Sequence, residues 1–162
     1  MTRPSSHNAR GFTLIELLIT VVIVGILALS AMPLAELAVQ RGKESELRSA
    51  LRQIREAIDA YRRDVEEGRI ARKTLDSGYP PTLDVLVAGV EDEKSPNRKK
   101  IYFLRRIPRN PLVDDAKLSN ADTWGKRSYA SPADDPKAGD DVFDVFPVGE
   151  GIGLNGIPYR DW

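Results

Sequence analysis

The chain has 162 residues, of which 24 are basic and 24 are acidic, so its formal net charge is zero. This balance gives no sign of a protein that binds nucleic acid or acidic substrates through bulk charge. Cysteine is absent and His7 is the single histidine, which excludes disulfide cross-links and any catalytic site built on cysteine.

A polar leader, residues 1–11, precedes a long apolar segment. The leader contains Arg3 and Arg10 and no acidic residue, whereas no charged residue occurs from Leu17 to Ala35. A helix rises about 1.5 Å per residue, so roughly twenty such residues span a hydrocarbon core of about 30 Å. We therefore predict a transmembrane helix over residues 12–37, and the basic leader predicts that the rest of the chain lies across the membrane.

Glu16 lies just inside this apolar segment. A carboxylate at that depth is unfavourable in lipid, so Glu16 needs a partner or a functional reason to be there. The alternative is a side chain that snorkels to the headgroups. Further along, Gly25 and Pro33 both weaken the helix interior, and a kink at Pro33 is expected.

Residues 38–68 continue the helix with an amphipathic pattern. Six apolar residues recur at spacings of four and three, namely Leu47, Leu51, Ile54, Ile58, Tyr61 and Val65. The stripe covers fewer than three heptads, which favours a face that holds a C-terminal domain over a coiled coil. The helix is expected to end near Glu67, with Gly68 as its stop. Charged residues on the other faces, including Glu44 and Arg55, are expected to be solvated.

Residues 69–162 predict one small globular domain. The expected elements are a short helix from Thr82 through Val87 with Leu83, Leu86 and Val87 inward, strands at 101–105, 127–130 and 142–148, and an exposed turn at 119–123. The fold class is therefore α+β, with a long N-terminal helix packed on a small antiparallel sheet. The glycine-rich tail, residues 149–156, has too little chain behind it to form the helix that a phosphate-binding loop needs.

The run Gly11-Phe12-Thr13-Leu14-Ile15-Glu16, followed by Gly25 and Pro33, resembles the class III signal of type IV pilins and of type II secretion pseudopilins. The resemblance implies a pilin-like fold. It implies that a prepilin peptidase cuts after Gly11 and methylates the new amino terminus of Phe12. It also implies that His7 is lost on processing, and that Gly25 to Pro33 can lose helicity in a fibre.

Motifs in the C-terminal domain narrow the resemblance to the pseudopilins. They are Tyr79-Pro80, Tyr102 to Pro108, Trp124-Gly125, Asp141 to Val145 and Trp162, whereas Leu112 to Thr123 looks inserted. The resemblance implies a non-enzymatic subunit of a periplasmic fibre that drives protein export. Its implied partners are further copies of itself, minor pseudopilins, the prepilin peptidase and an inner-membrane assembly platform.

Other readings of the same signal stay open. One is a type IV pilin or minor pilin of a surface fibre, with a role in adhesion, motility or DNA uptake. Another is a membrane-anchored periplasmic binding module. In each case the implied location is the inner membrane, with a single span and a periplasmic C-terminal domain.

The resembled family commonly binds calcium in its last loop, where this chain has the glycine-rich tail in place of closely spaced aspartates. Calcium takes six to eight oxygen ligands, several of them carboxylates. The candidates here are Asp140, Asp141, Asp144, Glu150 and Asp161, with Asn155 and backbone carbonyls. Ordinary loop and strand-edge acids are an equal interpretation.

Overall fold

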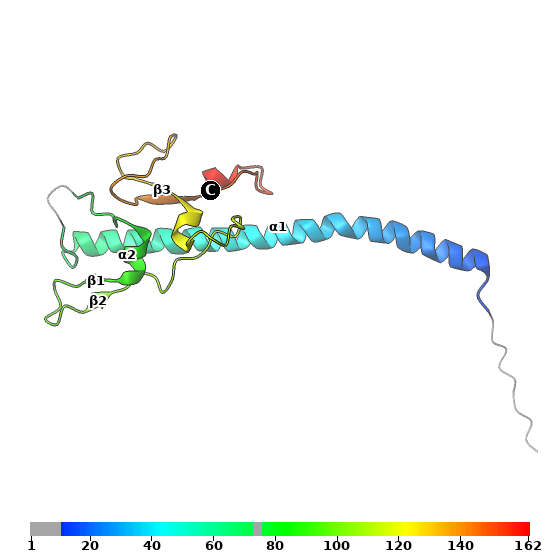
Figure 1. Cartoon of the computed structure of the whole chain (residues 1–162), viewed down its shortest axis with the longest axis horizontal. Helices are drawn as coiled ribbons and strands as arrows, with labels where there is room; N and C mark the ends of the chain where they lie inside the picture. The colour runs from blue at the N-terminus through cyan, green and yellow to red at the C-terminus, as the bar shows by residue number, and fades with distance from the viewer. Residues whose placement is uncertain (1–10, 73–75) are drawn as a thin grey trace, which may run out of the picture. The chain divides into compact units, whose positions relative to one another are not determined.

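The computed structural model describes residues 11–72 and 76–162, with residues 29–33 described by their backbone alone. The predicted leader therefore lies outside the described residues except for Gly11. The chain divides into two compact units, Met1–Val39 and Gln40–Trp162. The first unit contributes only helix to the described structure, and the second contains every strand (Figure 1).

Helix α1, Leu14–Glu66, begins in the first unit and continues into the second. Its end confirms the prediction, because Gly68 has a φ of 70° and its N–H donates to the carbonyl of Val65 at 3.0 Å. Glycine adopts this left-handed conformation without the penalty that a Cβ brings. The helix therefore stops at the residue that the sequence indicates.

The predicted apolar stripe forms the core of the second unit. All six of its residues are buried, and Leu47 and Ile54 are completely inaccessible. They pack against buried residues from the later elements, namely Ile70, Leu83, Leu86, Ile107, Ala121, Trp124, Val142, Val145 and Tyr159. Burial of an apolar face against other elements, rather than intrinsic propensity, stabilises such a helix in water.

Helix α2, Leu83–Ala88, follows Thr82 as predicted, and Leu83 and Leu86 are buried while Val87 is half-buried. The Thr82 side chain makes no capping hydrogen bond, although its backbone has the extended conformation of a cap. The helix is therefore held by its two buried leucines and not by the expected cap.

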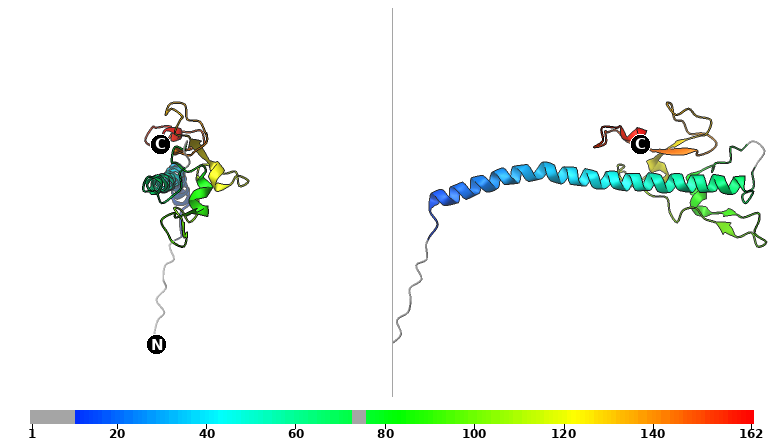
Figure 2. Two further views of the ribbon diagram at one scale, coloured as in Figure 1. Left: turned by 90° about the vertical axis from the view of Figure 1, so that its left-hand side faces the viewer. Right: turned by 180° about the vertical axis from the view of Figure 1, so that it is seen from behind.

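Two separate two-stranded antiparallel sheets complete the unit and lie on different sides of α1 (Figures 1 and 2). Strands β1, Val90–Glu91, and β2, Lys100–Ile101, form one pair. The prediction of a strand at 101–105 was wrong beyond Ile101. Phe103 and Leu104 instead turn back to α2, where both of their N–H groups donate to the carbonyl of Leu86.

Strands β3, Trp124–Arg127, and β4, Asp144–Pro147, form the second pair, with Gly125 opposite Phe146. The antiparallel pair is confirmed, but β3 begins and ends three residues earlier than the predicted 127–130. Ser128 turns the chain instead, because its N–H donates to the Lys137 carbonyl and its own carbonyl accepts from the N–H of Ser131. The predicted turn at 119–123 is a short 3₁₀ helix, η1 (Asn120–Thr123).

The expectation that this turn is exposed holds for Ser119, Asn120 and Asp122 but was wrong for Ala121 and Thr123, which are buried. The fully buried Asn110 explains the difference. Its backbone N–H donates to Thr123 Oγ1 at 3.2 Å, and its side-chain amide donates to the carbonyls of Thr123 and Val148. A buried amide needs such partners, and Asn110 thereby joins the segment before η1 to the end of β4.

Candidate functional site

The N-terminal motif forms the beginning of α1. Gly11 and Glu16 are exposed, and Phe12 is 78% exposed. Thr13 precedes the helix, and its Oγ1 accepts a hydrogen bond from the Glu16 N–H at 3.3 Å. The spacing of Thr13 and Glu16 is that of a capping box, which is a sequence signal for the start of a helix.

The Glu16 carboxylate is free within the described part of this single chain, where no basic side chain forms an ion pair with it. A carboxylate in the first turn is favourably placed beside the positive end of the helix dipole. Glu16 is therefore fixed in position by the helix and available to a group from outside the chain.

Exposed apolar side chains lie on all sides of the helix in the first unit. The most exposed are Phe12, Leu14, Ile15, Leu17, Val21, Val24, Ile26, Leu27, Leu34 and Val39, each at 60% or more. A helix that is hydrophobic on all sides belongs inside lipid or a larger core.

In the described residues, no helix is long and apolar enough to cross a membrane. The membrane span expected over residues 12–37 stays a prediction.

Gly25 and Pro33 both lie within α1, whose backbone is helical through the segment that the resemblance marks as able to melt. A Cβ added at Gly25 would meet nothing within 4 Å, so no close contact within the single chain requires a glycine at this position. The side chain of Pro33 lies outside the described residues, and the expected kink stays a prediction.

The five candidate calcium ligands are not brought together. Among the described residues no three histidine, cysteine, aspartate or glutamate side chains are close enough to hold a metal ion. The carboxylate of buried Asp141 accepts from the Tyr129 N–H at 2.8 Å. Asp144 pairs with Arg55 and Arg127, and Asp161 with Arg160. These residues do not fit a calcium site, which needs several carboxylates around one ion.

Asp140 and Glu150, the two remaining candidates, are exposed. Neither forms an ion pair with a described residue. The calcium assignment stays a prediction without a geometric basis.

The glycine-rich tail closes on itself and on α1. Ile152 forms an isolated antiparallel bridge with Pro158, and the Gly153 N–H donates to the Ile157 carbonyl at 2.9 Å. The 3₁₀ helix η2, Tyr159–Asp161, follows. Residues 149–162 therefore have a defined structure, although seven of these fourteen are residue types that favour loops.

Glu44 is the residue of α1 on which this tail converges. It is only 3% exposed, and its Oε1 accepts from the Leu154 N–H at 2.7 Å and from the Tyr159 hydroxyl at 3.0 Å. Gln40 Nε2 donates to the same oxygen at 3.3 Å, and Arg48 lies 3.5 Å from Oε2. The expectation that Glu44 is solvated was wrong, because the tail covers it and supplies its donors.

Burial raises the pKa of the Tyr159 hydroxyl, and the hydrogen bond that it donates to Glu44 acts in the same direction. Gln40 Nε2 donates to this hydroxyl at 3.1 Å, which opposes the rise in pKa. The hydroxyl therefore stays protonated and remains a donor to the carboxylate across the physiological pH range.

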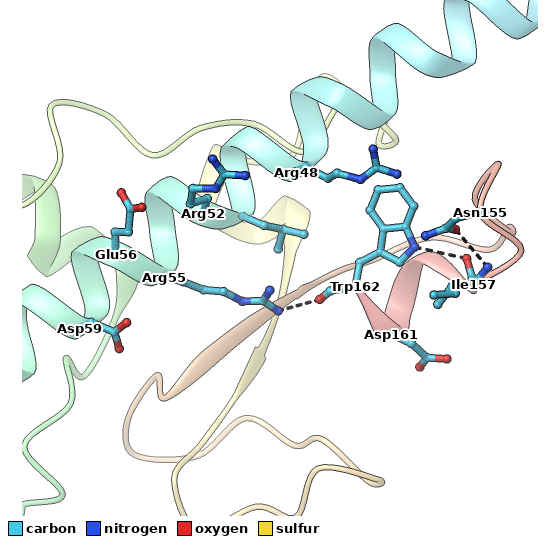
Figure 3. Close-up of a pocket in the computed structure, with 10 residues that line it drawn as sticks. Arg48, Arg52, Arg55, Glu56, Asp59, Asn155, Ile157, Asp161 and Trp162 are labelled. Atoms are coloured by element: carbon cyan, nitrogen blue, oxygen red, sulfur yellow. Dashed lines mark hydrogen bonds between the residues drawn. The ribbon is translucent and has the colours of Figure 1, made fainter.

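Arg55 makes the second connection between α1 and the end of the chain. Its guanidinium donates to Asp144 Oδ1 at 2.8 Å, to the Val145 carbonyl at 3.0 Å and to the Trp162 backbone oxygen at 2.8 Å. Two turns earlier in α1, the Arg48 guanidinium lies 4.3 Å from the centre of the Trp162 ring (Figure 3). The expectation that Arg55 is solvated holds only in part, because its side chain is 38% exposed but its guanidinium is paired with Asp144.

A groove of about 470 Å³ lies between this face of α1 and the tail (Figure 3). Its lining mixes both charges with apolar groups and comprises Arg48, Leu51, Arg52, Arg55, Glu56, Asp59, Asn155, Ile157, Asp161 and Trp162. Neither histidine nor cysteine is among these lining residues. In the sequence, nothing distinguishes the charged residues of α1 that line the groove from those that are fully solvated.

The N-terminal segment matches a known protein family. A family described as the prokaryotic N-terminal methylation motif matches residues 6–32. This range contains the predicted cleavage position after Gly11 and most of the apolar segment.

Similar proteins extend the match over most of the chain. A type II secretion system core protein G of Escherichia coli (strain K12) is 28% identical over 141 residues, which cover 85% of this chain and 92% of that protein. One of Dickeya chrysanthemi is 28% identical over 156 residues, 93% of this chain and 94% of that protein. One of Klebsiella pneumoniae is 27% identical over 142 residues, 84% and 94% respectively. No solved structure gives a significant match.

Proposed function

We propose, from the premise that this chain is a pilin-like protein similar to type II secretion system core protein G, that it is a structural subunit of a type II secretion pseudopilus. The observation that carries the proposal is the start of α1. There the carboxylate of Glu16, unpaired among the described residues, lies in the first turn of a helix whose exposed surface is apolar on every side. The relatives support the same role for the whole chain, and a structural role needs no catalytic residues.

The proposed assembly begins with processing. A prepilin peptidase cuts after Gly11 and leaves Phe12 as the new amino terminus, which is then methylated. Before assembly, residues 12–37 anchor the subunit in the inner membrane with residues 38–162 in the periplasm. The exposed apolar side chains of the first unit support this location, because lipid or neighbouring helices remove them from water.

In the fibre, the positive amino group of Phe12 pairs with Glu16 of an adjacent subunit. Opposite charges attract strongly where the surroundings are apolar, and each offsets the desolvation of the other. Thr13 supports this role for Glu16, since its hydroxyl caps the helix at the Glu16 N–H and fixes the first turn. The pairing sets the axial step between subunits.

The proposed partners follow from this assembly. They are further copies of the chain, minor pseudopilins at the fibre end, the peptidase and an inner-membrane platform that draws subunits from the membrane. Gly25 supports close contact between helices, because its missing side chain leaves open surface on α1.

The test is co-expression of the chain with a prepilin peptidase and an assembly platform, followed by intact mass measurement and electron microscopy. We expect wild type to lose residues 1–11, to gain a methyl group and to form fibres. Glu16→Ala should be processed normally but should not form fibres, because the amino group of Phe12 is left buried without its partner.

Glu36→Ala is the matched control, since Glu36 is an exposed carboxylate of the same helix unit. It should be processed and assembled like wild type. The proposal that the chain is a pseudopilus subunit would be rejected if Glu16→Ala formed fibres in normal abundance, or if the leader of wild type stayed uncut. An uncut leader would favour the membrane-anchored binding module, whereas fibres that extend beyond the cell surface would favour a type IV pilin.

A further inference from the structure

The end of the chain is bound to α1 at two places, and both are made by protein groups. The buried carboxylate of Glu44 accepts from the Leu154 N–H and from the Tyr159 hydroxyl. The Arg55 guanidinium donates to the Trp162 backbone oxygen. The two residues of α1 are about three turns apart, and they hold residues 154–162 at two separate places.

Aromatic contacts lie between these two places. The rings of Tyr159 and Trp162 meet edge to face with centres 5.2 Å apart, and the Arg48 guanidinium covers the Trp162 ring. Arg48 also lies within ion-pair distance of Glu44. One connected set of side chains therefore reaches from the buried carboxylate to the last residue.

The carboxylates that a calcium ion would need bind protein groups instead. Asp141 accepts a backbone hydrogen bond from Tyr129, and Asp144 lies between Arg55 and Arg127. Glu44, the carboxylate that the tail does surround, receives only N–H and O–H donors from Gln40, Arg48, Leu154 and Tyr159. A cation would have to displace these donors, whereas a carboxylate satisfied by them is stable when buried.

We propose that Glu44 holds the C-terminal tail on α1, together with Arg55, in place of a bound calcium ion. The tail of this protein is then ordered independently of metal. The inference goes beyond the proposed function, because it concerns the single subunit and holds whether or not the subunit forms a fibre.

The test follows release of the last residue from the full chain in detergent, using intact mass and carboxypeptidase Y, a serine protease that needs no metal ion and therefore works in EDTA. Digestion is run with added Ca²⁺ and with EDTA, for wild type, Glu44→Ala and Glu46→Ala. Glu46 is the matched control, since it is an exposed glutamate two residues along the same helix. The protease acts on a tail that has left α1, so the rate reports the opening of the tail.

We expect wild type to release Trp162 at the same rate in Ca²⁺ and in EDTA. Glu44→Ala should release it about tenfold faster or more in both, because the Leu154 N–H and the buried Tyr159 hydroxyl lose a charged acceptor. Glu46→Ala should match wild type. Faster release from wild type in EDTA, or equal rates for Glu44→Ala and Glu46→Ala, would overturn the proposal.

Tyr159→Phe gives a second variant that keeps the ring and removes one donor to Glu44. This variant replaces Glu44→Ala in the test if circular dichroism shows that Glu44→Ala has lost helix content. We expect release a few times faster than in wild type, with helix content unchanged. An unchanged rate in this variant would also overturn the proposal.

Discussion

Gly125 of β3 is the residue over which the Phe146 ring of β4 lies. The two residues are directly paired, and a Cβ added at Gly125 would overlap the ring. The neighbouring Trp124 is 3% exposed, and its indole N–H donates to the Pro108 carbonyl at 2.8 Å. The Trp-Gly pair therefore combines a buried ring with a site that has no room for a side chain.

Replacement of this glycine should destabilise the second unit. We predict that Gly125→Ala lowers the free energy of unfolding by about 1–3 kcal/mol, because the added methyl forces the Phe146 ring out of place. Urea unfolding followed by the combined fluorescence of Trp124 and Trp162 measures the change. Gly42→Ala is the control of opposite sign, because a Cβ at Gly42 of α1 meets nothing within 4 Å.

Gly42→Ala should be stabilising by up to about 1 kcal/mol, since alanine loses less conformational freedom in a helix than glycine does. If both alanine variants shift stability in the same direction, then contact with Phe146 is not what requires Gly125. The pair separates a steric requirement at one glycine from the general effect of glycine on backbone freedom.

At the scale of elements, Arg69 joins the end of α1 to the β1–β2 pair. Its guanidinium reaches Asp64 at 3.1 Å and Asp92 at 3.0 Å, and its carbonyl accepts from the Glu93 N–H at 2.8 Å. The hydrogen bond from Arg69 lowers the pKa of Asp92 below its ordinary value of 3.8. The link therefore stabilises the fold most while Asp92 is ionised.

This link gives a pH dependence with a definite sign. A carboxylate whose pKa is lower in the folded state stabilises the fold above its unfolded pKa, and that contribution is lost as the pH falls through the folded pKa. We predict that Asp92→Asn is less stable than wild type at neutral pH, and that the difference narrows below pH 3.8. Urea midpoints measured over a series of pH values test this.

Glu93→Gln is the control for that series, because Glu93 is an exposed acid next to Asp92. Its midpoint should follow that of wild type at every pH. A gap between Asp92→Asn and wild type that stays constant as the medium becomes acidic would show that charge on Asp92 does not stabilise the pair of strands.

The elements also show what the sequence can predict. The long helix and its six buried apolar residues followed from a repeated pattern, in which each turn adds to the same signal. The strands of two and four residues carry too few positions for alternation to fix their bounds. Glu44 and Arg55 looked like any exposed helix charge, because their partners lie more than eighty residues away.

At the scale of the whole molecule, the two units differ in how their apolar residues are covered. The second unit buries its stripe against its own strands, loops and short helix, whereas the first unit leaves Leu14, Leu17 and Leu27 at least 60% exposed. Exposure of that extent in water is unfavourable and promotes association. We therefore predict that lipid or further copies of the chain cover the first unit.

Membrane retention of the full chain tests this requirement directly. We predict that the wild-type chain, expressed without an assembly platform, stays with the membrane fraction after washes with high salt and alkaline carbonate. Val22→Lys should move a large part of the chain to the supernatant, because a lysine near the centre of a membrane helix costs about 2.5–3.5 kcal/mol. Val22 is exposed in the single chain, so the substitution removes no internal contact of the fold. Val22→Leu, which keeps the apolar surface, should behave like wild type. Recovery of wild type in the alkaline supernatant would contradict the anchor and would mean that copies of the chain alone cover its apolar helix.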